Sequence, residues 1–221
     1  NNRNEVIGYV HQPGGTASYP FRRAFVWRNG EMTILEGLCD SCESIADDIN
    51  GHGIIVGYAY PEPGVGADNN RIIHAVMWDA EGNITDVGTF DGYRSAAFEI
   101  NNNNQIAGYY GTTTGGWYHE HAVLWEDGNW QEIIIPDTVE TVTYPFQNNG
   151  IRNENECNYS LIAGGRSAIV KELVLNEHGD VGITILSDDD YSCAVLWSNG
   201  EVRDILKDFY CNGCFFDVSG I

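Results

Sequence analysis

The sequence predicts an all-β protein, a small β-propeller of about five four-stranded blades, one of them degenerate. Three observations predict it. A block in which Asn precedes Gly by seven positions recurs along the chain, a block ending in Trp follows each copy, and no segment has sustained helical periodicity. An open β-solenoid remains the alternative architecture.

The first block is a polar turn followed by a short run rich in Val, Ile and Tyr, which is typical of a β-strand. The segments 1–9, 50–58 and 101–109 share it, each ending in Gly-Tyr. A fourth copy, Asn176 to Gly182, is one residue shorter. The segment before it, Ala168 to Asn176, comes nearest to a helical pattern, but its β-branched residues favour a strand.

The second block ends in Trp and is followed by an acidic or Asn-Gly turn, which is the sequence signal of a β-hairpin. Its four copies end at Trp27, Trp78, Trp125 and Trp197. A large aromatic residue required once in each repeat predicts packing between blades. The same interpretation applies to the His that opens two copies, since Arg or Cys stands at that position in the others.

Two further blocks complete each unit. The third is found at 31–35, 83–87, 130–134 and 201–205, and the fourth at 44–49, 95–100 and 215–221. Four short strands in a unit of roughly 40 to 50 residues are the content of a propeller blade. We therefore predict a single domain, 1–221, with units at about 1–49, 50–100, 101–151, 152–175 (degenerate) and 176–221.

The chain starts inside the turn block and ends with the Ile that precedes this turn in other copies. We therefore expect Phe215 to Ile221 and Val6 to Val10 to pair as neighbouring strands that latch the ring. Exchanged between chains, the same contact would propagate into a filament.

Composition disfavours some partners. Lys plus Arg number 11 against 32 Asp plus Glu, giving a net charge of −21. Such a surface repels phosphate backbones and anionic lipids, so nucleic acid and membrane surfaces are poor partners, and no membrane insertion is expected. No apolar run is long enough for a membrane helix, and no signal peptide is present. A first residue other than Met indicates a processed or trimmed product, compatible with secretion.

The six cysteines favour an oxidising compartment. Two pairs have Cys-x-x-Cys spacing, and local disulfides are the preferred interpretation over a shared zinc site or redox activity. The predicted bonds are Cys39 to Cys42, Cys211 to Cys214 and, by elimination, Cys157 to Cys193.

The Trp block together with the Asn block resembles the HAF repeats, a bacterial extracellular family named after a His-Ala-Phe motif. His74-Ala75 and His121-Ala122 keep its first two letters, and Ala24-Phe25 keeps its last two. The resemblance covers the chain except roughly 152–175. It implies a secreted or surface-exposed propeller-like protein, and it carries no established chemistry.

No catalytic constellation is recognisable, and no cofactor is expected. His119 and His121 form a weak metal pair without a visible third ligand. Asp188 and Asp190 are a weak calcium candidate within an acidic turn. Weak glycosylation signals stand at Asn83 and Asn158.

A ligand would bind at the links between the first two blocks of each unit. These links are long in three copies, and equivalent links of a propeller emerge on one side. Their aromatic residues are the predicted ligand-binding residues: Tyr19, Tyr60, Tyr110, Trp117 and Tyr118.

These features together predict an extracellular or cell-surface, non-enzymatic protein with a structural, adhesive or self-assembling role. Its expected partner is a further copy of itself, or a surface glycan or protein. A carbohydrate-binding lectin that uses the aromatic links and a hydrolase with an unrecognised acidic site remain alternatives.

Overall fold

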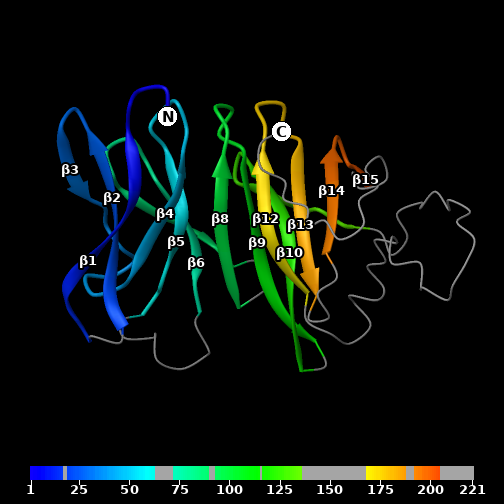
Figure 1. Ribbon diagram of the computed structural model, residues 1–221, viewed down its shortest axis with the longest axis horizontal. Coiled ribbons are helices and arrows are strands. Elements are labelled where there is room, and N and C mark those ends of the chain that lie inside the picture. The colour runs from blue at the N-terminus through cyan, green and yellow to red at the C-terminus, as the bar shows by residue number, and fades with distance from the viewer. Residues whose placement is uncertain are drawn as a thin grey trace, which may run out of the picture.

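The computed structural model describes residues 1–16, 19–62, 72–89, 93–114, 116–135, 168–187 and 192–204. This part of the chain is all β, with no α-helix and hence no helix able to cross a membrane. Its strands stand side by side in a row of sheets that runs from β3 to β15 (Figure 1). The predicted all-β class is confirmed.

The sheets are antiparallel blades. The first blade contains three described strands, β1 (Val6–Thr16), β2 (Tyr19–Arg28) and β3 (Glu31–Ile34). The second has four, β4 (Ser44–Ile49), β5 (Ile55–Ala59), β6 (His74–Trp78) and β7 (Ile84–Gly88).

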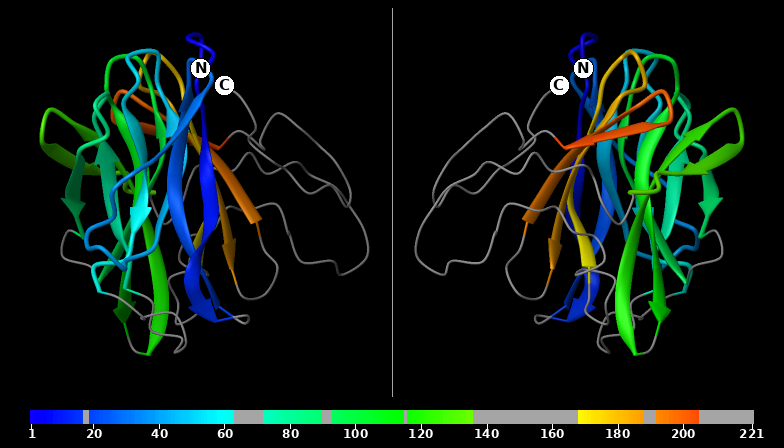
Figure 2. Two further views of the ribbon diagram at one scale, coloured as in Figure 1. Left: turned by 90° about the vertical axis from the view of Figure 1, so that its left-hand side faces the viewer. Right: turned by 90° about the vertical axis from the view of Figure 1, so that its right-hand side faces the viewer.

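The third blade consists of β8 (Arg94–Ile100), β9 (Ile106–Thr114), β10 (Trp117–Glu126) and β11 (Asn129–Glu132). The fourth consists of β12 (Ala168–Leu175), β13 (Val181–Ser187), β14 (Ser192–Ser198) and β15 (Glu201–Asp204). A single parallel bridge, His119 opposite Ala168, joins these two blades. The two end views show the blades fanned around one axis (Figure 2).

Tight hairpins follow the Trp strands, as the sequence predicts. In the first blade Asn29 and Gly30 have φ of 50° and 88°, and in the fourth Asn199 and Gly200 have 51° and 84°. Two successive positive φ values define the hairpin turn that matches the twist of β-strands, and Asn-Gly adopts it at low cost.

A glycine is sterically required next to a bulge in the second and third blades. The bulge in β4 lies between Ala46 and Asp48, and a Cβ on Gly57 would stand 2.0 Å from the carbonyl oxygen of Ile45. A Cβ on Gly108 would likewise stand 2.2 Å from the Ala96 oxygen. Both separations are far below contact distance, so only glycine is accommodated at these positions.

In the fourth blade the bulge lies further from the turn, between Val170 and Glu172. Ile183 pairs with Val195 and therefore occupies the position of Gly57, which pairs with Val76. The sequence interpretation that this copy is one residue shorter is wrong, because Gly182 is not the equivalent glycine. Moving the bulge removes the clash and admits a large side chain.

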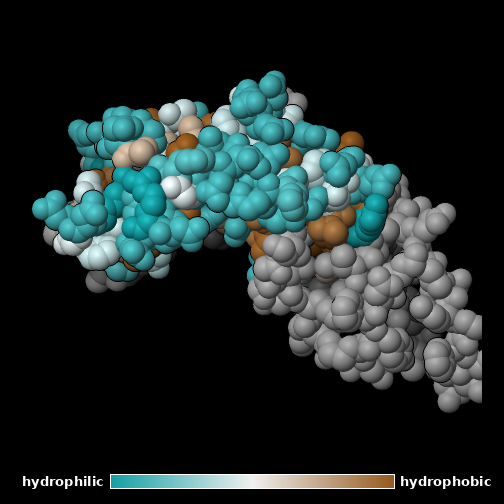
Figure 3. Space-filling model, turned by 90° about the horizontal axis from the view of Figure 1, so that it is seen from above, coloured by the Kyte–Doolittle hydropathy of each residue, from teal (hydrophilic) through white to brown (hydrophobic). Residues whose placement is uncertain are grey.

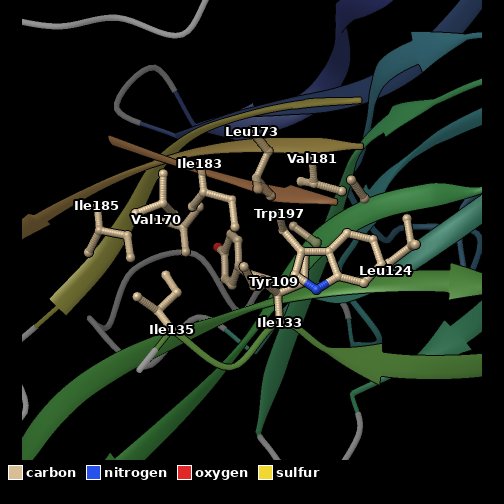
Figure 4. Packing of buried hydrophobic residues seen from close by; sticks show 14 of the residues in the cluster. Tyr109, Leu124, Ile133, Ile135, Val170, Leu173, Val181, Ile183, Ile185 and Trp197 are labelled. Carbon is tan, nitrogen blue, oxygen red and sulfur yellow. The ribbon is translucent and has the colours of Figure 1, made fainter. Parts of the chain in front are cut away.

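The apolar core lies between neighbouring blades. One cluster joins the first and second blades, one the second and third, and one the third and fourth. Figure 4 shows the last, in which Tyr109 and Leu124 of the third blade meet Leu173, Ile183 and Trp197 of the fourth. The prediction that the repeated Trp packs between blades is confirmed for Trp78 and Trp197, which are 0% and 7% exposed.

The predicted unit boundaries are only partly described. Ala168–Leu175 is a strand, as expected, and it pairs with β13, so it belongs to the sheet of the last unit. The count of five blades stays a prediction. The latch between Phe215–Ile221 and β1 falls on residues outside the described ranges, and among described strands β1 pairs only with β2.

Candidate functional site

Each of the last three blades buries one cross-strand trio against the blade before it. A trio consists of three directly paired residues with Trp in the middle, here called the Trp trio. The trios are Ile55, Trp78 and Ile84; Ile106, Trp125 and Trp130; and Val181, Trp197 and Val202. The indole of Trp78 also donates a 2.8 Å hydrogen bond to the carbonyl oxygen of Glu36 in the preceding link.

The first blade has the same trio, but no described blade packs against it. Val6 pairs with Trp27, which pairs with Met32, and these residues are 54%, 39% and 54% exposed. Phe25 and Ile34 pair beside them on the same face, and Ile34 is 38% exposed. We call these five residues the open face. Exposed apolar residues gathered on one sheet face mark an interaction site more often than scattered ones.

A line of asparagines connects the blades at one end of the molecule. Nδ2 of Asn1 donates to the carbonyl oxygen of Asn50 at 2.7 Å, Asn50 donates in the same way to Asn101 at 3.1 Å, and Asn101 to Asn176 at 2.9 Å. We call this the Asn ladder. The surface at the end of the molecule where the Asn ladder lies is largely hydrophilic (Figure 3).

Each ladder residue also shapes its own turn. Oδ1 of Asn50 accepts hydrogen bonds from the backbone N–H groups of His52 and Ile54, and Asn101 and Asn176 repeat the pattern. The side chain of Asn50 is therefore satisfied although the residue is only 4% exposed. The repeated Asn seen in the sequence has a structural role.

The inner strands β4 and β8 bring carboxylates together. Oδ2 of Asp48 accepts a 2.8 Å bond from the N–H of Ile100 in the next blade. Burial, followed by the charges of Asp48, Asp47 and Glu172, raises the pKa of Glu99 to about 7. Burial and Asp48 also raise the pKa of Asp47 to about 7. The Asp47 side chain is nevertheless exposed to solvent, which screens its charge. Glu99 is therefore the better residue for testing the effect of pH on stability.

A buried polar network lies on the fourth-blade side of β10. Glu120 is 8% exposed, and its carboxylate accepts bonds from the Tyr118 hydroxyl at 2.7 Å and the Val170 N–H at 2.8 Å. Burial raises the pKa of Glu120. The Arg94 guanidinium lies over the Tyr118 ring and donates to the Tyr109 hydroxyl at 2.8 Å. The sequence indicated the neighbouring histidines and not Glu120, since the burial of Glu120 depends on a strand of another blade.

The second and third blades each contain a histidine paired with a carboxylate. In the third blade this pair lies on the face opposite to Glu120. Nδ1 of His74 lies 2.8 Å from Asp86, and Nδ1 of His121 lies 3.0 Å from Glu132. Of these two histidines, only His121 has a hydroxyl from the described part of the chain on its other nitrogen, Thr112 Oγ1 at 2.9 Å. Hydroxyl, imidazole and carboxylate stand in this order in hydrolase triads, but recurrence of the pair without a hydroxyl favours a role in packing.

Of the predicted ligand-binding residues, the structure brings Tyr110 and Tyr118 to neighbouring strands of one blade, on opposite faces. The Tyr110 hydroxyl donates to Glu132 at 3.0 Å and its ring stacks on His121. Tyr60 is 5% exposed. The side chains of Tyr19 and Trp117 lie outside the described set. Ligand binding by these residues stays a prediction.

The predicted Cys39 to Cys42 disulfide is present. The side chain of Cys193, and residues Cys157, Cys211 and Cys214, fall outside the described residues, as do Asn158, Asp188 and Asp190. Asn83 is exposed, and its side chain donates to Asp79 at 2.7 Å. Within the described residues no three His, Cys, Asp or Glu side chains are grouped to enclose a metal.

No protein-family model and no curated protein sequence matches the chain. Among solved structures it is similar to the β-propeller domain of the Trilobed protease from Pyrococcus furiosus, which has an open velcro topology. The TM-score is 0.50 at 12% identity, over 91% of this chain and 49% of that one.

It is also similar to an acylaminoacyl peptidase solved with a chloromethyl ketone, with TM-score 0.50 at 15% identity. That match covers 91% of this chain and 25% of the peptidase. The chain thus spans about half and a quarter of these two proteins. At such identities the likeness shows the fold alone, so the class defined is the β-propeller, and peptidase activity belongs to those proteins.

Proposed function

We propose that the protein is a non-enzymatic, extracellular propeller module that self-associates, two copies packing their open faces against each other. The single observation that carries the proposal is the exposed Trp trio of the first blade. In the three other described blades the equivalent residues are buried or partly buried against the preceding blade, so this face has the composition of an interface.

A second copy is the occupant that the described residues favour. On the fourth blade, Thr184 and Ala194 face away from the third blade and are only 1% exposed, so this part of the chain offers no second open face. The same patch on both copies gives a two-fold contact that closes on itself. The described sheets of the two first blades then pack face to face, as in a β-sandwich.

Electrostatics sets the expected salt response. Each copy carries a net charge of −21, so two copies repel each other at long range. Apolar packing between the open faces does not become stronger when the salt concentration is lowered. Association should therefore tighten as salt is raised and repulsion is screened, the opposite of association driven by ion pairs.

The Cys39 to Cys42 disulfide supports an extracellular setting, because disulfides persist in oxidising compartments. The resemblance to HAF repeats points the same way. A self-associating module in which no catalytic centre is recognisable can provide structural support outside the cell.

The test is the molar mass of the purified chain by analytical ultracentrifugation over a wide concentration range. We expect a species of twice 24.5 kDa for the natural sequence. Trp27→Glu and Met32→Glu should weaken association at least tenfold, since buried Trp residues are energetic anchors of interfaces. Ile134→Glu is the matched control, because Ile134 is 73% exposed in the third blade.

A molar mass of one chain at every concentration would refute self-association and point to closure of the open face by the chain's own residues. Growth without limit as concentration rises would indicate a head-to-tail filament in place of the two-fold contact. Equal weakening by the Ile134 control would show that added charge, and not the open face, is responsible.

A further inference from the structure

Two histidines of β10 project from the same side of the third blade. Alternate residues of a strand share a face, so His119 and His121 lie together while Glu120 between them points into the interface with the fourth blade. The buried position of Glu120 and its bond to Val170 fix this alternation. Across the hairpin, Thr112 pairs with His119 and Tyr110 with His121.

The ring of His121 is held in one orientation and one tautomer. Nδ1 faces Oε1 of Glu132 at 3.0 Å, so this nitrogen carries the proton. Nε2 is then the nitrogen with the lone pair, and it accepts from Thr112 Oγ1 at 2.9 Å. Glu132 is itself positioned by the Tyr110 hydroxyl. A carboxylate behind one ring nitrogen, leaving the other as a donor atom, is the usual support of a metal-binding histidine.

A metal ion binds the neutral imidazole, in which one ring nitrogen keeps a free lone pair. Both imidazoles are partly exposed to solvent, so an ion can reach them.

We propose that His119 and His121 chelate one divalent transition-metal ion of the Zn²⁺ or Cu²⁺ class. Imidazole nitrogens suit these borderline metals, whereas Ca²⁺ and Mg²⁺ require oxygen ligands. Nε2 of His121 exchanges its hydrogen bond from Thr112 for the metal, and water fills the remaining positions. Because only two protein ligands contribute, we expect an affinity on the order of micromolar, far below that of closed structural sites.

The chain contains its own control. His74 in the second blade has the same carboxylate support from Asp86, at 2.8 Å, but the residue two positions before it is Ile72. His74 therefore shares the supporting carboxylate with His121 but lacks the second imidazole two positions before it. If a supported histidine were sufficient, both blades would bind metal equally.

Isothermal titration with ZnCl₂ or CuSO₄ in a non-chelating buffer tests the proposal on the full chain. We expect one site, at least about tenfold weaker binding in His119→Gln and His121→Gln, and a change within twofold in His74→Gln. Glu132→Ala should also weaken binding by about tenfold through loss of positioning. MgCl₂ and CaCl₂ should not compete.

A readout specific to nitrogen ligands separates this site from the many surface carboxylates. The electron paramagnetic resonance spectrum of the one-to-one Cu²⁺ complex should show two imidazole nitrogens, and one in His119→Gln. This variant is decisive, because no hydrogen bond that fixes His121 is removed. A spectrum unchanged in His119→Gln, or no transition-metal binding at micromolar concentrations, would overturn the proposal.

Discussion

The first and second blades share a sequence block but differ in what covers it. Trp78 is 0% exposed, packed against the first blade and hydrogen-bonded through its indole, whereas Trp27 at the same repeat position is 39% exposed. The repeat therefore determines that this face is apolar in every blade. Which neighbour buries it depends on the position of the blade in the row.

The largest expected difference between the two blades concerns the Trp itself. Trp78→Ala should lower the free energy of unfolding by about 3 to 5 kcal/mol, because a large buried aromatic leaves a cavity. Trp27→Ala should lower the free energy of unfolding by less than about 1 kcal/mol in dilute monomer, where the side chain is already exposed to solvent. Urea unfolding measures both. Equal losses would mean that the open face is covered in solution.

The second comparison concerns the glycine beside the bulge. Gly57→Ala should cost about 3 kcal/mol, since the new Cβ meets the backbone oxygen of Ile45. Gly8 is the equivalent residue of the first blade, and among the described residues a Cβ there meets the Phe25 ring, at 3.1 Å. Gly8→Ala should therefore change stability by less than about 1 kcal/mol.

This pair of variants also tests the predicted latch. A strand formed by Phe215–Ile221 beside β1, with the same bulge, would place a carbonyl against Gly8. Gly8→Ala would then cost as much as Gly57→Ala. A mild effect of Gly8→Ala in thermal unfolding counts against the latch.

The Asn ladder gives a smaller expected effect. Asn50→Ala removes two donated bonds, to the Asn101 oxygen and to Asn104 Oδ1, and leaves the N–H groups of its turn without their acceptor. We expect a loss of about 2 kcal/mol. Asn1→Ala, at the exposed end of the ladder, should cost less than about 1 kcal/mol. Calorimetric unfolding of both variants compares them, and equal losses would contradict a ladder whose inner members matter most.

The smallest effect depends on pH. The folded pKa of Glu99 is raised to about 7 from an ordinary value of 4.5, so the folded state holds the proton more tightly. The free energy of unfolding therefore falls as pH rises from about 4.5 to 7. Glu99→Gln should stabilise the protein by about 1 kcal/mol at pH 8, after allowance for solvent screening, and not at pH 4.

Glu31→Gln is the control for Glu99→Gln, because it removes one negative charge from the exposed β3 of the first blade. A pH-independent gain in both variants would attribute the effect to net charge alone. Chemical unfolding at the two pH values distinguishes these outcomes.

Local features of the fold could be predicted from the sequence because they depend on neighbouring residues. The Asn-Gly hairpins, the short strands, the strand at Ala168–Leu175 and the Cys39 to Cys42 bond are of this kind. The position of Ile183 could not be predicted, since it depends on where the partner strand places its bulge. A spacing rule based on Gly-Tyr misaligns that copy by one residue.

The candidate sites could be predicted only in part. The sequence pointed to His119 and His121 but not to the support that Glu132 gives, because 11 residues and a turn separate His121 from its partner. It assigned each Trp to packing but could not show that Trp27 lacks a partner blade among the described residues. Burial of Glu120 depends on the fourth blade, which follows much later in the chain.

The Asn ladder also affects how the protein ages chemically. Asn50 is followed by Gly51, the pairing in which a flexible backbone nitrogen most readily attacks the side-chain carbonyl carbon and expels ammonia. Here the Gly51 N–H donates to Asn102 Oδ1 at 2.7 Å, and Oδ1 of Asn50 accepts from His52 and Ile54. Cyclisation would have to break these bonds. The folded ladder thus protects its own amide from conversion to Asp, which would replace a donor with a charged acceptor against the Asn101 oxygen.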